Sequence, residues 1–66
     1  MESLFLQRTN EEQKKFLNDI GININDDLTK IEEELYEYMQ LNGFENDELN
    51  DIGIKCEEIL DILSDI

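Results

Sequence analysis

Residues 49–66, LNDIGIKCEEILDILSDI, decide the predicted fold of this chain. Their apolar residues recur at intervals of three, four, three, four and three positions, as Leu49, Ile52, Cys56, Ile59, Leu63 and Ile66. This heptad spacing is typical of a helix that packs along one side against other helices. The pattern lasts for about two and a half heptads, which is too short for an isolated coiled coil and favours a helical bundle.

The hexapeptide LNDIGI that begins this stretch also occurs at residues 17–22. In the first copy, Gly21 has the place of the left-handed residue after a helix, with Leu17 against Ile22 as in a Schellman cap. In the second copy, Gly53 lies inside the heptad pattern, and no capping residue follows it to start a new helix. An interior glycine costs about 1 kcal/mol relative to alanine, so we expect another helix to approach closely at Gly53, or else a local kink.

Two further helices are predicted upstream, at about 10–20 and 26–42. Thr9 and Glu12 form the pattern of a capping box at the first helix. Asn25 is the expected N-cap of the second, which carries one apolar stripe and ends at Gly43. The stripe consists of Leu28, Ile31, Leu35, Tyr38 and Met39.

The third helix is predicted at about 47–65, with Asn46 as its N-cap. The glycine before it, Gly43, repeats the helix-stop signal, with Met39 and Phe44 as the contacting pair. We therefore predict an all-α fold, a small three-helix bundle with a short N-terminal extension, in a single acidic domain of residues 1–66. Leu4, Phe5 and Leu6 of the extension are expected to pack across the end of the bundle, with contact to a partner as the alternative.

Length and cysteine content limit how this domain is stabilised. A chain of 66 residues buries only about 60% of its unfolded surface. It has one cysteine and no histidine, which excludes an internal disulfide and the common zinc ligand sets. Helix packing, self-association or a partner must supply the stability.

The net charge of −13, from 18 acidic and five basic residues, restricts the partners. Direct binding to nucleic acid or to an anionic membrane is electrostatically unfavourable, so the expected partner is basic. The alternative is that the acidity serves solubility. The chain has no apolar run of about 18 residues and no basic start of a signal peptide, which predicts a cytoplasmic protein.

Catalytic and cofactor motifs are missing from the sequence. Cys56 occupies a core position of the third helix, and we expect a buried thiol rather than a nucleophile. Neither 19–30 nor 45–56 has the ligand pattern of an EF-hand loop. Asp26-Asp27-Leu28, the nearest counterpart of a carrier-protein helix start, has no serine for a phosphopantetheine arm. We predict no enzyme, no cofactor and no metal site.

Acidic residues on the outer sides of the helices are the predicted binding surface. On the third helix these are Asp47, Asp51, Glu58, Asp61 and Asp65, and on the second they are Asp26, Glu33 and Glu37. Successive carboxylates lie about 5–6 Å apart, comparable to the charge spacing of a nucleic-acid strand. Ile54 projects among the carboxylates of the third helix and is the expected apolar anchor. The alternative is an ordinary solvated helix face with one exposed isoleucine.

These features predict a small acidic protein-binding module, an inhibitor that covers the basic, nucleic-acid-binding surface of a nuclease, repressor or defence effector. DNA-mimic-like inhibitors of this kind, often carried by phages or mobile elements, resemble the chain in size and charge. One alternative is a structural module that forms a homodimer. Another is an antitoxin or immunity protein that blocks a toxin.

Overall fold

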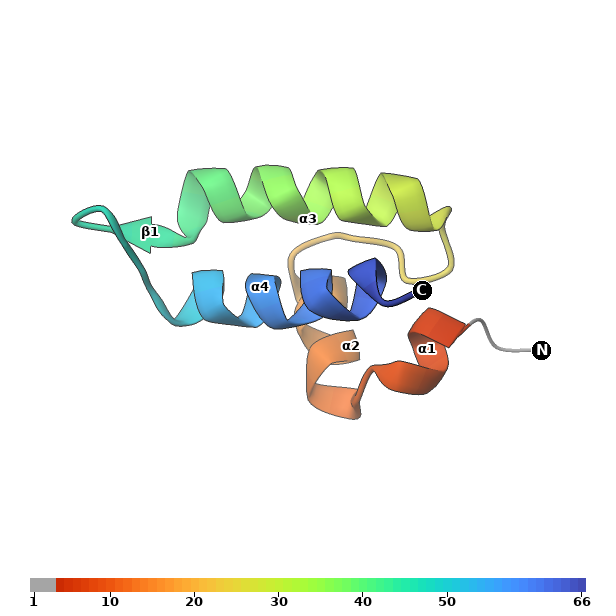
Figure 1. The fold of residues 1–66 in the computed structure, drawn as a ribbon. Coiled ribbons are helices and arrows are strands. Elements are labelled where there is room, and N and C mark those ends of the chain that lie inside the picture. The colour runs from red at the N-terminus through yellow and green to blue at the C-terminus, as the bar shows by residue number, and fades with distance from the viewer. Residues whose placement is uncertain (1–3) are drawn as a thin grey trace.

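The computed structural model describes residues 4–66 and is mostly helical (Figure 1). Its elements are α1 (Leu4–Arg8), α2 (Glu11–Asp19), α3 (Leu28–Asn42), β1 (Phe44–Glu45), β2 (Glu48–Leu49) and α4 (Asp51–Ser64). The three predicted helices correspond to α2, α3 and α4. A three-helix bundle is not confirmed, because α1 and a two-stranded antiparallel hairpin are additional elements. Within the described residues, no helix is long and apolar enough to cross a membrane.

Helix α1 lies in the segment that was predicted as an extension. Phe5 is fully buried in the core, which agrees with the predicted packing rather than a partner contact, whereas Leu4 is exposed. The helix ends at Arg8, and the hydroxyl of the next residue, Thr9, donates to the carbonyl oxygens of Phe5 (3.1 Å) and Leu6 (3.2 Å). Thr9 therefore closes α1 rather than capping α2.

Helix α2 is capped one residue later than predicted. The Asn10 side chain accepts from the Gln13 backbone at 2.7 Å, and the Gln13 side chain accepts from the Asn10 backbone at 2.9 Å. These two bonds form a capping box.

The end of α2 confirms the predicted Schellman cap. Gly21 has φ +86°, and its N–H donates to the Asn18 carbonyl at 3.1 Å. The Ile22 N–H donates to the Leu17 carbonyl at 2.9 Å, and both side chains are buried. The first LNDIGI is therefore a helix stop.

Helix α3 begins two residues later than predicted, because Asp27 rather than Asn25 is its N-cap. The Asp27 side chain accepts from the Thr29 backbone at 3.3 Å. The predicted apolar stripe is confirmed, with Ile31 and Leu35 fully buried.

Helix α3 ends at Asn42, directly before Gly43, as predicted, but the predicted left-handed conformation of Gly43 and the predicted cap at Asn46 are wrong. Gly43 has φ −90°, and Phe44 is exposed in β1. Asn46 (φ 53°) and Asp47 (φ 66°) form a two-residue turn in which β1 pairs with β2, Phe44 opposite Leu49. Positive φ at both central residues defines a type I′ turn, and Asn and Asp tolerate it better than most residues.

Asn50 is the N-cap of α4, so the second LNDIGI contains a helix start rather than lying wholly within a helix. The Asn50 side chain accepts from the Gly53 backbone at 2.9 Å. It also donates to the Asn42 carbonyl at 2.9 Å, and the Asn50 N–H donates to the Gly43 carbonyl at 2.9 Å. These bonds join the end of α3 to the start of α4.

Gly53 lies inside α4, as predicted, and the predicted close approach is present. The approaching group is the backbone of Gly43 at the end of α3. A Cβ atom on Gly53 would overlap the Gly43 carbonyl oxygen and lie 2.6 Å from Cδ2 of Leu49. No kink is needed to explain the glycine.

The core lies where α3 and α4 run antiparallel, with α1 and α2 packed beside them (Figure 1). It consists of Phe5, Leu17, Ile22, Ile31, Leu35, Cys56, Ile59 and Leu63.

The two ends of the predicted heptad seam, Leu49 and Ile66, are exposed. Leu49 belongs to β2 rather than to a helix, and Ile66 follows the end of α4. The molecule measures 42 × 22 × 19 Å, because the hairpin extends the α3–α4 pair at one end.

Candidate functional site

The outer side of α4 contains most of the predicted binding residues. Cys56, Ile59 and Leu63 face the core, and the opposite side of the helix is solvent-exposed. We call this side the acidic face, and define it by Asp51, Ile54, Glu58, Asp61 and Asp65, all of which are exposed. Ile54 is 47% exposed, so it is an apolar side chain among carboxylates, as predicted. That it binds a partner stays a prediction.

The remaining predicted residues do not join this surface. Asp47 lies in the hairpin turn rather than on a helix. Asp26 lies before the N-cap of α3 rather than in its first turn, and it is paired with Lys30. Glu33 and Glu37 are exposed on α3, on the side away from the core that α3 shares with α4. Glu37 instead borders a shallow groove with Ile20 and Leu41. The helical period predicts that Glu33 and Glu37 lie on an outward helix face. The fold shows that this outer side of α3 and the outer side of α4 point in different directions.

The ion pairs within residues 4–66 involve carboxylates outside the acidic face. The lysines bind carboxylates of the N-terminal half, in the pairs Lys14–Glu11, Lys15–Asp19, Lys30–Asp26 and Lys55–Glu12. In residues 4–66, no ion pair joins Lys or Arg to a carboxylate of the acidic face. Residues 31–66 hold 12 of the 18 acidic residues and one of the five basic residues. The α3–α4 half therefore carries nearly all of the net negative charge.

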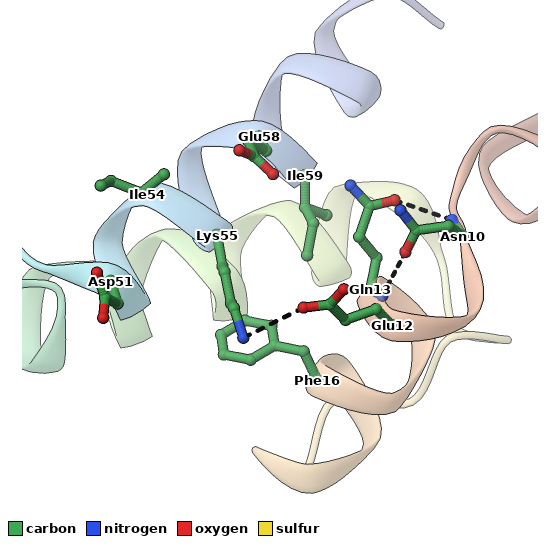
Figure 2. Close-up of a pocket in the computed structure, with 9 residues that line it drawn as sticks. All are labelled: Asn10, Glu12, Gln13, Phe16, Asp51, Ile54, Lys55, Glu58 and Ile59. Atoms are coloured by element: carbon green, nitrogen blue, oxygen red, sulfur yellow. Dashed lines mark hydrogen bonds and ion pairs between the residues drawn. The ribbon is translucent and has the colours of Figure 1, made fainter.

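A groove with a volume of about 350 Å³ lies beside the acidic face, between the start of α2 and α4 (Figure 2). Its apolar lining residues are Phe16 and Ile54, which are at least partly exposed, and Ile59, which is fully buried. Its carboxylates are Glu12 from α2 and Asp51 and Glu58 from α4. Ile54 thus borders both the groove and the acidic face.

Of the described residues, Lys55 is the only cation that lines this groove, and it connects the two helices. Its Nζ lies 3.6 Å from Oε1 of Glu12 and 5.8 Å from the centroid of the Phe16 ring. Figure 2 shows the lysine reaching across the groove toward both groups. Phe16 is held in turn by an edge-to-face contact with Tyr38 of α3, with ring centroids 6.4 Å apart.

Sequence reasoning missed this arrangement of Glu12, Phe16 and Lys55. The available signal was that Lys55 is the only basic residue after Lys30. A lone cation in an acidic half has a carboxylate or an aromatic ring as its natural neighbour. The sequence does not say which one, because α2 and α4 meet only in the folded chain.

Cys56 is buried, as predicted, and burial raises the pKa of its thiol. A raised pKa lowers the fraction of reactive thiolate, so the position suits packing rather than nucleophilic chemistry. Across residues 4–66, no group of three or more Cys, Asp or Glu side chains could hold a metal ion. Comparisons of the chain with protein families, with curated proteins and with solved structures found no match.

Proposed function

We propose that this protein is a small cytoplasmic binding module that covers a basic surface of another protein, such as the nucleic-acid-binding site of a nuclease, repressor or defence effector. The observation that carries the proposal is the acidic face of α4, whose carboxylates have no ion-pair partner among residues 4–66 and surround the exposed Ile54. Unpaired carboxylates steer a basic partner, and a central apolar residue supplies the desolvated contact.

The electrostatic distribution supports a directional contact. Net charge alone attracts any basic protein from any side. Here the excess is concentrated in the half that contains α3, the hairpin and α4. Asp51, Glu58, Asp61 and the C-cap Asp65 follow one another at steps of seven, three and four residues, so they lie along one side of α4 for about four turns.

Two matched double variants test which face binds. Asp61→Lys/Asp65→Lys reverses two carboxylates of the acidic face, and Glu33→Lys/Glu37→Lys reverses two on the outer side of α3. Both pairs are exposed, spaced by four residues and change the net charge equally. The partner is first isolated from lysate at low salt and identified, and the affinity of each variant for it is then measured over a salt series.

The expected result is a steep fall of affinity with salt for the wild-type protein, and a much larger loss for Asp61→Lys/Asp65→Lys than for the α3 variant. The partner should also release its nucleic acid when this protein binds. Equal losses in both variants would mean that only net charge matters. Affinity that ignores salt and both variants would make the acidic face a solvated surface and refute the proposal.

A homodimer is the second candidate, and the hairpin end of the molecule favours it. Phe44 and Leu49 are paired across the two strands and exposed, and Leu41 in the last turn of α3 is 74% exposed. The Gly53 edge does not support this candidate, because Gly43 of the same chain covers it. Light scattering after gel filtration tests the dimer, which Phe44→Ser/Leu49→Thr should dissociate. An antitoxin or immunity protein would use the acidic face in the same way, against a toxin.

A further inference from the structure

We infer that the groove between α2 and α4 is a seat for an arginine side chain of a protein partner, and that Lys55 occupies this seat in the free protein. The inference rests on the proposed function and names the side chain that the partner inserts beside the acidic face. An aromatic ring, three carboxylates and an exposed isoleucine match a cation on an apolar stem.

Lys55 demonstrates that a cation fits there. Its Nζ is within reach of both the Phe16 ring, at 5.8 Å, and Glu12, at 3.6 Å. Neither contact is tight, since 3.6 Å exceeds hydrogen-bond length and 5.8 Å is near the outer limit of a cation–π contact. The lysine side chain is also 48% exposed, so its contacts contribute little stability and it can be displaced.

Displacement leaves Lys55 with other carboxylates on its own helix. Asp51 lies four residues before it and Glu58 three residues after it, and both also line the groove. Side chains at these spacings are neighbours on a helix surface. The lysine therefore exchanges one ion pair for another, and the exchange opens the space between Glu12 and Phe16.

Arginine suits the vacated space better than lysine. Its guanidinium is planar and weakly hydrated, stacks on an aromatic face and binds a carboxylate through two parallel hydrogen bonds. Phe16 supplies the ring and Glu12 the carboxylate, and the exposed Ile54 borders the groove. A basic surface that docks on the acidic face would place such a side chain at the groove, because Ile54 belongs to both.

The test is a nuclear magnetic resonance titration of the full isotope-labelled chain with the capped peptide Gly-Gly-Arg-Gly-Gly. Peptides with citrulline or lysine in place of arginine are titrated in parallel. We expect the arginine peptide to shift the ring protons of Phe16 and the amides of Glu12 and Lys55. The neutral citrulline peptide should leave them unchanged, and the lysine peptide should bind more weakly than the arginine peptide.

Comparing Lys55→Ala with Lys30→Ala separates the effect of emptying the groove from the effect of removing one positive charge. Each removes one positive charge, and each removes an ion pair of 3.6 Å, but Lys30 lies on α3 outside the groove. Lys55→Ala should bind the arginine peptide about two- to fivefold more tightly than Lys30→Ala, the factor expected for losing an exposed cation–π competitor. Phe16→Leu, which keeps an apolar side chain, should weaken binding while the circular dichroism of the fold is retained.

Equal affinities for Lys55→Ala and Lys30→Ala would overturn the inference, as would shifts confined to Asp61 and Asp65 with the Phe16 ring unaffected. The seat and the proposed function can fail separately. The seat is wrong and the acidic face stands if the lysine variants are equivalent while Asp61→Lys/Asp65→Lys still loses the natural partner. The acidic face is wrong and the seat stands if the peptide still shifts the Phe16 ring while partner binding ignores salt and charge reversal.

Discussion

Gly43 and Gly53 are in direct backbone contact, and neither position has space for a side chain. A Cβ atom on Gly43 would lie 2.9 Å from the Cα of Gly53, closer than real Cβ atoms approach other atoms. The contact joins the end of α3 to the first turn of α4. It therefore sets the separation of the two long helices at the hairpin.

Gly53→Ala should destabilise the protein by about 2 kcal/mol, even though alanine is the better helix former by about 1 kcal/mol. The added methyl group overlaps the Gly43 carbonyl, so the helices must separate. Urea denaturation followed by circular dichroism measures the change, and Gly43→Ala should behave alike. A gain in stability for Gly53→Ala would show that helix propensity outweighs the contact.

Asn50→Ala should cost about 1–2 kcal/mol, because the side chain caps α4 and also binds the Asn42 carbonyl. Asn50→Asp keeps the capping oxygen and loses the donor, so its loss should be smaller. Thermal denaturation compares the two. If aspartate were as damaging as alanine, the bond to Asn42 rather than the cap would be the main contribution.

Asp47→Gly should stabilise the protein by about 0.5 kcal/mol, because relief of left-handed strain exceeds the entropy that glycine loses on folding. Asp47 has φ 66° in the type I′ turn, where Asn-Gly is the favoured pair. Asp47→Asn removes the same charge and keeps the side chain. Equal stabilisation by both variants would attribute the gain to reduced repulsion with Glu45 and Glu48.

Alkaline pH should weaken the fold through Cys56. Burial raises the pKa of this thiol above its ordinary value of 9.0, so the folded state holds the proton more strongly than the unfolded state. The stability from the neutral thiol is complete below the unfolded pKa and is lost as pH rises through the folded pKa. The free energy of unfolding, measured from pH 7 to 11, should fall more steeply for wild type than for Cys56→Ala. Parallel slopes would contradict this.

The helical segments were predictable because burial imposes a period on them. Ile31, Leu35, Cys56, Ile59 and Leu63 follow helical spacing and are buried. Helix α1 was missed because five residues are too few to show a period, and its stability comes from the burial of Phe5.

The hairpin was missed for a different reason. Asn46 followed by Asp47 and Glu48 reads equally well as a helix start or a turn. The choice depends on the Gly43–Gly53 contact and on the bonds of Asn50, which are properties of the folded chain.

The candidate site was predictable in part. Exposure of Ile54 and its neighbouring carboxylates follows from the helical period of one element. The groove could not be predicted, because Glu12 and Phe16 are about 40 residues from Lys55 in the sequence. Such a site depends on how helices pack, and no local pattern encodes it.

The two copies of LNDIGI allow the conformation of one fixed peptide to be compared at two places in the same chain. The six residues are identical, yet one copy ends a helix with glycine at φ +86° and the other begins one. The flanking residues differ: 23–27, NINDD, are poor helix formers, whereas 55–58, KCEE, include lysine and two glutamates that extend a helix. Exchanging these flanks would ask whether neighbours alone dictate the conformation of a fixed peptide.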